Sequence, residues 1–349
     1  MPTFRTAVVA ELLTERDGLQ RVRVRWPDPS STGDQAYVLT DLTGPVVTGD
    51  EVVLNTTAVD LGLGTGGWHV VHWNLSRREW SKPGGGHVMK LRYTSLQIDT
   101  GAVEEHQRDV IDEVALDLEA MPVVVVSVHS QMAAVAAAIT EAAPALRIVV
   151  VMTDEAALPA ALSDLLADLV DRGWISAVVT SGHAFGGDLE AVGPASALAA
   201  AKAVAEADVV IMGPGPGVVG TGTTTGHSGM AAVAHVDLAA ALGAKGILAL
   251  RASSGDQRSR HQGLSHHSRA ALALVARPVT VAVPRGETRL RAAVMAVASS
   301  AALVIEVDVP DVVATMHEAN LHVTTMGRSP EEDRLFFRAA AAAGVAAIT

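Results

Sequence analysis

The chain of 349 residues has no cysteine, which excludes disulfides, cysteine-ligated zinc, iron–sulfur clusters and thiol nucleophiles. Aromatic residues make up only 3% of the chain although 49% of it is hydrophobic, so alanine, valine, leucine and isoleucine must build the core. This composition is typical of a buried parallel sheet that is covered by helices.

The sequence also lacks an excess of positive charge and any long hydrophobic run. Its net charge of −12 argues against a general nucleic-acid or membrane partner, because both bind basic surfaces. Every apolar run is interrupted well before the roughly 20 residues that a spanning helix needs. The N-terminus does not have the basic-then-apolar order of a signal peptide. We therefore expect a cytoplasmic protein, and its alanine-rich helices suggest a homodimer.

Signatures of known catalytic machinery are missing as well. The sequence has no Gly-x-Ser-x-Gly elbow, no Walker A lysine, no kinase signature and no His-Glu-x-x-His pair. The sequence therefore indicates where a site lies rather than which reaction takes place there.

The first 85 residues are predicted to form a small, barrel-like all-β domain. Short β-branched runs separated by glycine-rich and polar turns favour this architecture. The expected strands are 6–12, 20–26, 35–42, 51–55 and 68–73. Residues 75–86 look like a linker, and residues 87–96 look like one more strand leading into the second domain.

Residues 86–349 are predicted to form a Rossmann-like, doubly wound α/β domain with a mostly parallel sheet. From Met121 onward, apolar runs alternate with helical segments, as right-handed crossovers between parallel strands require. The expected strands are 123–128, 147–153, 175–181, 208–213, 246–251, 279–284 and 303–309. The expected helices are 131–142, 156–171, 194–207, 230–242, 265–276, 289–298 and 330–343.

Polar residues gather where these strands end. Ligands of open α/β sheets bind beyond the carboxyl ends of the strands, so this asymmetry predicts a pocket at that edge. Polar loops and helix caps are the plainer explanation, and they account for the serines and threonines but poorly for the histidines. The histidines in these loops are His129, His183, His227, His261, His266 and His267.

The loop Gly213–Gly229 (GPGPGVVGTGTTTGHSG) follows an expected strand and precedes an expected helix. Residues 215–220 match the dinucleotide pattern G-x-G-x-x-G, but Pro214 and Pro216 lack the N–H groups of a phosphate cradle. Arg251 follows the next strand, where an NAD site would place an acid. We therefore do not expect NAD(P), and favour a smaller anion at the start of the helix.

Two further motifs carry candidate catalytic groups. In TSGHAFGGD, His183 and Asp188 form either a base with its orienting carboxylate or two metal ligands. The alternative is that His183 binds a loop carbonyl and Asp188 caps a helix that begins at Leu189. In RSRHQGLSHHSR, Ser265 is a predicted N-cap, and the helix dipole keeps His266 and His267 neutral.

A divalent metal such as zinc or manganese stays an open alternative for this edge. The candidate ligands are His183, Asp188 and His227. The loop from Asn55 to His69 is either a lid over the edge or an ordinary barrel loop with Trp68 in the barrel core.

Five segments resemble one bacterial family, the domain-of-unknown-function family 3866. They are NTTAVDLGLGTGGWHVVHWN, LRYTSLQ, SGHAFGGDLEAV, GPGVVGTGT and RHQGLSHHS. Together they extend over nearly the whole chain. The family has no assigned activity, so the resemblance implies that these loops belong together but implies no chemistry.

The main hypothesis is an enzyme that binds a small anionic metabolite, a phosphate or a carboxylate. We predict His183, Asp188 and His266 as catalytic residues. The predicted ligand-binding residues are His129, Gly217, Gly220, Thr221, Gly222, Thr223, His227, Arg251 and His267. Two alternatives stay open: a non-catalytic protein that binds or senses a metabolite, and a structural homo-oligomer without a ligand.

Overall fold

A computed structural model describes residues 1–28, 33–64 and 66–349 of the chain. Thr65, in the predicted loop from Asn55 to His69, lies outside the described residues. The chain divides into two compact units, Met1–Gly101 and Ala102–Thr349. Each unit has its own hydrophobic core and is described by itself.

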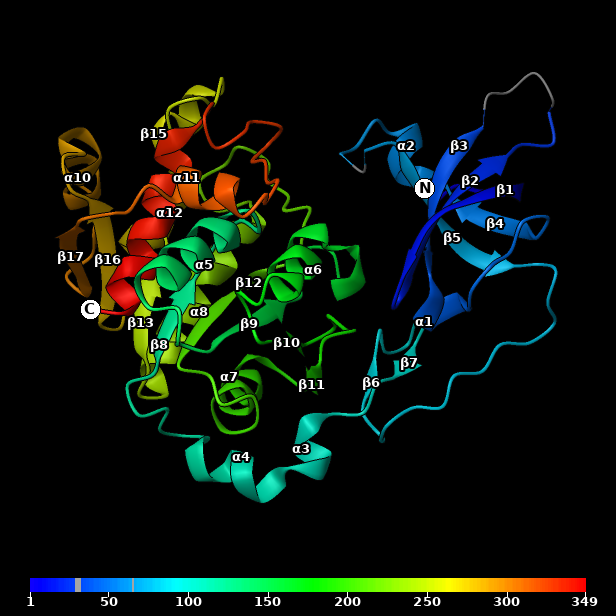
Figure 1. Cartoon of the computed structure of the whole chain (residues 1–349), viewed down its shortest axis with the longest axis horizontal. Coiled ribbons are helices and arrows are strands. Elements are labelled where there is room, and N and C mark those ends of the chain that lie inside the picture. Colours follow the sequence, from blue (N-terminus) through cyan, green and yellow to red (C-terminus); the bar gives the residue numbers. More distant parts are fainter. Residues whose placement is uncertain (29–32, 65) are drawn as a thin grey trace. The chain divides into compact units, whose positions relative to one another are not determined.

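In the first unit, the described residues form a closed β-barrel, as the sequence predicts (Figure 1). The strand order is β1-β2-β3-β5-β4, closed by pairing of β4 with β1. The strands are β1 (Phe4–Arg16), β2 (Leu19–Arg25), β3 (Asp34–Leu39), β4 (Glu51–Asn55) and β5 (Trp68–Asn74). Two short helices, α1 (Thr40–Thr43) and α2 (Thr57–Asp60), follow β3 and β4. Buried alanine, valine and leucine side chains fill the barrel.

The prediction of a continuous strand over residues 87–96 is wrong. This segment contains only β6 (Met89–Lys90), which pairs with β7 (Ile98–Asp99). The backbone turns left-handed at Leu91 and Tyr93, with φ of 51° and 61°. A strand cannot continue through such a conformation, so the chain turns back on itself.

The second unit confirms the predicted α/β fold. In residues 102–349, all of which the structure describes, eight parallel strands form one sheet in the order β11-β10-β9-β12-β8-β13-β16-β17. Their bounds are β8 (Pro122–Val125), β9 (Ile148–Thr153), β10 (Ala177–Ser181), β11 (Leu189–Ala191), β12 (Val209–Pro214), β13 (Lys245–Leu248), β16 (Val279–Pro284) and β17 (Ala302–Val307). A separate pair, β14 (Ala252–Ser253) and β15 (Gly263–Leu264), is antiparallel.

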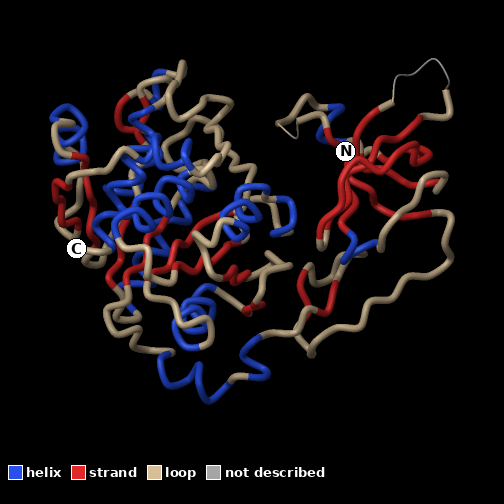
Figure 2. The backbone as a smooth tube through the Cα atoms, in the orientation of Figure 1, coloured by secondary structure: helices blue, strands red, loops and turns tan. Residues whose placement is uncertain are grey.

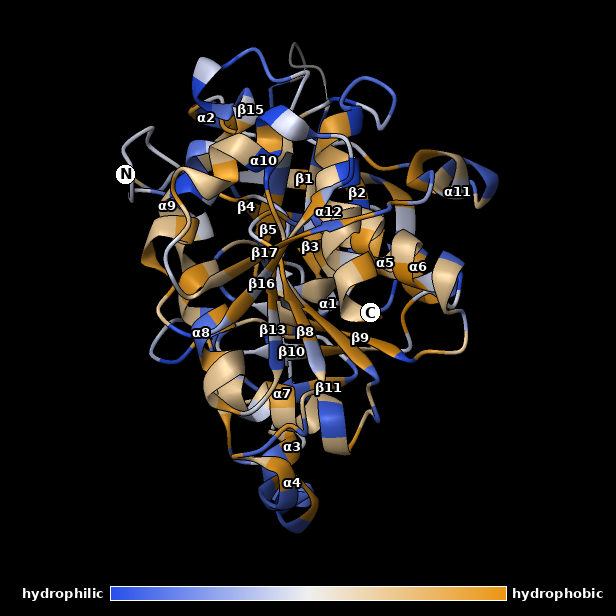
Figure 3. Cartoon of the chain, turned by 90° about the vertical axis from the view of Figure 1, so that its left-hand side faces the viewer, coloured by the Kyte–Doolittle hydropathy of each residue, from blue (hydrophilic) through white to orange (hydrophobic). Residues whose placement is uncertain are grey.

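Helices cover both faces of this sheet, as the strand and helix colours of Figure 2 show. One face packs against α5 (Gln131–Ala142), α6 (Asp164–Asp171), α11 (Val312–Glu318) and α12 (Arg334–Ala347). The other packs against α4 (Arg108–Val114), α7 (Pro194–Ala203), α8 (Ala231–Ala241), α9 (His266–Leu274) and α10 (Thr288–Met295). Figure 3 shows the central strands mostly in the hydrophobic colour, because both of their faces are buried.

The sheet reverses its winding direction between β8 and β12, which are neighbours. The helix after β8 is α5, on one face, whereas the helix after β12 is α8, on the other. Helices that leave adjacent strands toward opposite faces open a crevice at the carboxyl ends of those strands. The loops of residues 126–130 and 215–227 follow β8 and β12 at this edge of the sheet.

Some elements depart from the sequence prediction. The alternative in which Asp188 caps a helix that begins at Leu189 is wrong, because residues 189–191 pair in parallel with residues 179–181 as strand β11. Helices α3 (Val103–His106), α4 and α11 were not expected. Three 3₁₀ turns lie at Ala160–Leu162, Ser228–Met230 and Ser259–His261. Among the described residues, no helix has both the length and the hydrophobicity to cross a membrane.

Gly344 allows α12 to lie close to α5. A Cβ atom at this position would lie 2.7 Å from the Val135 carbonyl oxygen and 3.3 Å from the Ala138 Cβ. We predict that Gly344→Val lowers the free energy of unfolding by about 2–3 kcal/mol, because two packed helices must separate. The control Ala234→Val lies on the exposed side of α8 and should cost only about 0.5 kcal/mol. Urea unfolding measures both changes, and equal losses would show that the α5–α12 contact tolerates a larger residue.

Candidate functional site

The loop after β12 forms a small hairpin beside the crevice. Gly220 and His227 pair as an antiparallel bridge, and the amide of Thr221 donates to the Gly226 carbonyl at 2.9 Å. The amide of Thr223 donates to the Thr221 hydroxyl, which also bonds to the Thr223 hydroxyl at 3.0 Å. Gly217 and Gly222 have positive φ angles of 94° and 92° that the loop needs in order to turn. The hairpin therefore uses the Thr221 and Thr223 amides for its own hydrogen bonds.

His227 stands at the base of this hairpin with a defined tautomer. Its Nε2 lies 3.1 Å from the Thr224 carbonyl oxygen, which can only accept, so Nε2 carries the hydrogen. The buried Nδ1 therefore presents a lone pair, and it has no hydrogen-bond partner among the described residues. Burial lowers the pKa of His227, and nearby His266 and Arg251 lower it further.

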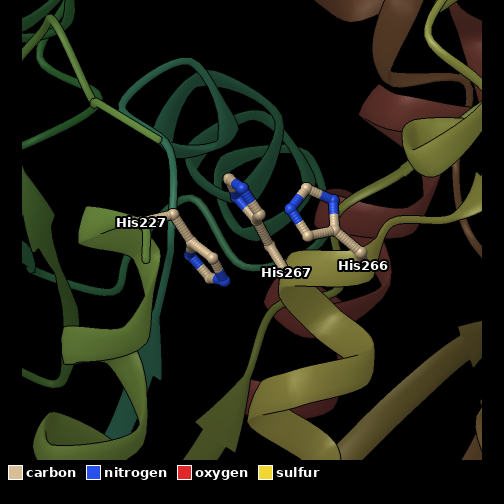
Figure 4. A group of neighbouring side chains, drawn as sticks. All are labelled: His227, His266 and His267. Carbon is tan, nitrogen blue, oxygen red and sulfur yellow. The ribbon is translucent and has the colours of Figure 1, made fainter. Parts of the chain in front are cut away.

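Helix α9 brings two further histidines to the same place. The Ser265 hydroxyl caps this helix by accepting from the His267 amide, and it also bonds to Nδ1 of His261 at 2.8 Å. His266 and His267 therefore occupy the first turn. Figure 4 shows both at the start of α9, with His227 facing them from the other chain segment. The ring centroids of His227 and His267 lie 3.6 Å apart in nearly parallel planes, and His266 lies 4.3 Å from His267.

Arg251 fixes the tautomer of His267. Its buried guanidinium donates from Nη1 to Nδ1 of His267 at 3.0 Å, so the hydrogen of the neutral ring lies on Nε2. Burial lowers the pKa of Arg251 to about 10, and Arg258 contributes to this shift, so the group stays charged at pH 7. Burial and the Arg251 charge hold the pKa of His267 well below its ordinary value.

His261 and His266 are also neutral, because burial and nearby arginine charges lower their pKa values. Burial and the Arg251 charge lower the pKa of His261 to about 3. Burial lowers the pKa of His266, and the nearby guanidinium groups of Arg260, Arg251 and Arg258 lower it further. Neither buried ring nitrogen of His266 has a hydrogen-bond partner within the described part of the chain. His266 can therefore still accept or donate a proton to a bound molecule.

A cavity of about 60 Å³ lies next to these rings. Three arginines, three histidines, two glycines and three apolar residues line it. They are Arg251, Arg258, Arg260, His261, His266, His267, Gly220, Gly222, Val218, Val219 and Met326. Asp256 offsets one of these charges, because its carboxylate accepts two bonds from Arg258 at 2.7 and 2.9 Å. The cavity is thus positively charged in a chain whose net charge is −12.

The three histidines of Figure 4 also form a set that could hold a metal ion. One nitrogen of each of His227, His266 and His267 lies within 4.8 Å of the others. The Thr224 carbonyl orients His227 as metal-binding histidines are commonly oriented, by accepting the hydrogen of the second nitrogen. Arg251 is less compatible with a metal, because it donates to Nδ1 of His267.

His129 lies at the same sheet edge but has a full set of partners. Its Nδ1 donates to the Pro214 carbonyl at 2.9 Å, and its Nε2 accepts from the Ser163 hydroxyl at 2.7 Å. Ser163 in turn caps α6. Burial lowers the pKa of His129 from 6.5 to about 4, against the opposing effect of Pro214. His129 therefore joins the loops after β8 and β12 to α6.

His183 and Asp188 follow β10 and are not members of the histidine group. The His183 amide donates to the Asp154 carboxylate at 2.9 Å, and the Asp188 carboxylate accepts from the Val178 amide at 2.8 Å. Asp188 thus supports the backbone of β10. The structure brings together six of the residues predicted from the sequence: Gly220, Gly222, His227, Arg251, His266 and His267.

The prediction omitted Arg258, Arg260 and His261 from the site. All three lie in the segment RSRHQGLSHHSR, whose density of charge and imidazole was the available signal. The 3₁₀ turn at residues 259–261 brings this segment back over the start of α9. No sequence pattern indicates such a return.

Comparison with protein-family models gives a single result. Residues 35–344 match the model described as "Protein of unknown function (DUF3866)". Neither the curated proteins nor the solved structures contain a match to the chain.

The buried, neutral His129 predicts that acid destabilises the second unit. Below pH 6.5 the unfolded chain binds a proton that the folded state does not take up until about pH 4. The contribution of this ring therefore falls by about 1.4 kcal/mol per pH unit as the pH drops from 6.5.

Urea unfolding at pH 7 and pH 5 measures this loss. In His129→Asn, the side-chain amide can still donate to the Pro214 carbonyl but does not titrate, so its stability should fall less steeply. Equal slopes for the wild type and the variant would show that His129 does not contribute to the acid sensitivity.

Proposed function

We propose a function for this chain, which belongs to the DUF3866 family of proteins of unknown function, from the geometry of its candidate site. In this proposal the protein is a cytoplasmic enzyme that acts on a small metabolite bearing a phosphate or a carboxylate. The observation that carries this proposal is the cavity beside α9, where three guanidinium groups and neutral, buried imidazoles meet. The segments that follow β12 and β13 line most of this cavity, and the carboxyl ends of parallel strands are where ligands of doubly wound sheets bind.

The arginines supply the charge that an anion requires. Arg251 is buried and protonated, and Arg260 is exposed beside Gly222. Arginine donates paired hydrogen bonds to phosphate and carboxylate groups, and such charge-assisted bonds are stronger in a partly buried site. A cavity of about 60 Å³ admits the anionic group alone, so the rest of the metabolite lies outside it.

His266 is the residue that we assign to proton transfer. It lines the cavity, is neutral at pH 7, and has two nitrogens without partners in the described residues. His267 is fixed by Arg251 and positions the guanidinium rather than titrating. The proposed reaction class is hydrolysis or group transfer next to the bound anion, with His266 as acid or base.

A metal-assisted version of this enzyme is the second candidate. The free Nδ1 of His227 and the free nitrogens of His266 favour it. A metal would supply a Lewis acid beside the anion. His267 could join this set only by giving up its bond to Arg251, and three nearby guanidinium groups repel a cation. We therefore prefer the version of the proposal in which the enzyme uses no metal. A nicotinamide cofactor is not part of either proposal.

Inorganic phosphate tests the anion site directly. We expect phosphate to raise the Tm relative to chloride at equal ionic strength, and at 100 times its Kd the gain is about 2.7 kcal/mol, or roughly 5 °C. Arg260→Gln removes an exposed cation of the cavity and should reduce the gain with little effect on folding. The control Arg285→Gln removes an exposed arginine that pairs with Asp308 outside the cavity, and it should keep the full gain.

The same measurement separates the two candidates. A phosphate response that persists in EDTA supports the metal-free version. A response that requires added zinc or manganese, and that His227→Ala abolishes, favours the metal-assisted version. If neither phosphate nor small carboxylates stabilise the protein under any of these conditions, the proposal is wrong.

A further inference from the structure

The β-barrel of the first unit has a topology that is independent of the histidine site. Its described strands close in the order β1-β2-β3-β5-β4, β3 and β5 run parallel, and α1 lies between β3 and β4. This is the strand arrangement of the OB-fold, whose β2–β3 face binds oligonucleotides or oligosaccharides.

The first unit carries little of the chain's net negative charge. Residues 1–101 contain 10 basic and 11 acidic side chains, a net charge of −1 within the −12 of the whole chain. Nearly all of the excess negative charge therefore lies in residues 102–349. The sequence-wide argument against a nucleic-acid partner does not apply to the barrel.

Strand β2 places its positive charges on the outer face of the barrel. Along this strand Val22 and Val24 are buried, whereas Arg23 and Arg25 are exposed and Arg21 is half-buried. Pairing with β3 puts Arg21 opposite Tyr37 and Arg23 opposite Gln35. The Arg23 guanidinium forms an ion pair with the carboxylate of Glu11 on β1 at 2.6 Å. Three arginines thus follow one row along the face.

Two aromatic rings continue this face onto the next strands. Trp68 of β5 stacks on Tyr37 of β3 with ring centroids 4.7 Å apart and planes 16° apart. The Arg21 guanidinium lies 5.6 Å from the Tyr37 ring and 5.8 Å from the Trp68 ring. The alternative that places Trp68 in the barrel core is wrong, because its neighbour His69 points inward instead.

We propose that the outer face of β2, β3 and β5 binds single-stranded nucleic acid. Tyr37 covers one face of the Trp68 ring, so an unpaired base stacks on the other face of Trp68, and Arg21, Arg23 and Arg25 contact the phosphates. A row of arginines alone would be an ordinary solvated strand face. The stacked aromatic pair beside it is the combination that sequence-tolerant single-strand binding uses. A neutral oligosaccharide would not need the arginines, and the bases of a duplex could not reach the rings.

Fluorescence anisotropy of the full chain with labelled homopolymers tests this proposal. The probes are oligo(dT) and oligo(U) of about 15 nucleotides, comparable to the upper site sizes of OB-folds. Both should bind more tightly than a duplex of equal length, and their relative affinities show whether DNA or RNA is preferred. With up to three phosphate contacts, the slope of log K against log salt should be about −2.

Variants assign the binding to this face. Trp68→Ala should weaken binding at least about fivefold through lost stacking, and Trp68→Phe should retain most of it. Arg25→Gln should reduce the size of the salt slope by about 0.7. Arg285→Gln, in the second unit and outside the anion cavity, should leave binding unchanged.

Three results would overturn the proposal. These are no binding of either homopolymer, equal binding by the wild type and the Trp68 and Arg25 variants, and a preference for duplex or for a neutral oligosaccharide.

Discussion

The burial of the parallel sheet on both faces is the constraint on which the second unit depends. Strands such as β8 and β12 are fully apolar because helices cover both of their sides. Polar side chains are therefore confined to the segments beyond the strand ends. Where the helices change from one face to the other, between β8 and β12, these segments border a crevice rather than a covered edge. The histidine group comes from segments beyond the strand ends, where polar side chains can be accommodated.

Charge within this crevice is arranged so that the imidazoles stay neutral while the guanidinium groups stay charged. Burial and the arginines both lower the pKa values of His261, His266 and His267. Arg251 keeps its proton in spite of burial. A neutral imidazole beside a fixed cation suits proton transfer next to a bound anion better than it suits binding of a second cation. This arrangement is the physical reason for preferring an anionic ligand.

The sequence predicts the barrel, the parallel sheet and the sheet edge at which the histidine group lies, because long apolar runs and polar strand ends are local patterns. It does not predict β11, whose three residues are too few to show a pattern. It also does not separate His129 from His266, since both histidines follow an apolar strand pattern at the same edge of the sheet. His129 has two good partners and His266 has none within the described residues, and only the folded neighbours of each ring reveal this difference. Two of the cavity arginines, Arg258 and Arg260, lie at a 3₁₀ turn whose path depends on tertiary contacts.

The hairpin at residues 220–227 has a consequence for how the family can diversify. Its tip satisfies its own amides and hydroxyls, and the residues from Thr221 to Gly226 are exposed. Loops of this kind tolerate exchange and insertion, because no buried contact of the sheet is broken. Relatives can therefore differ in length and composition at this tip, whereas the buried His227 at its base is constrained by the rings that pack against it.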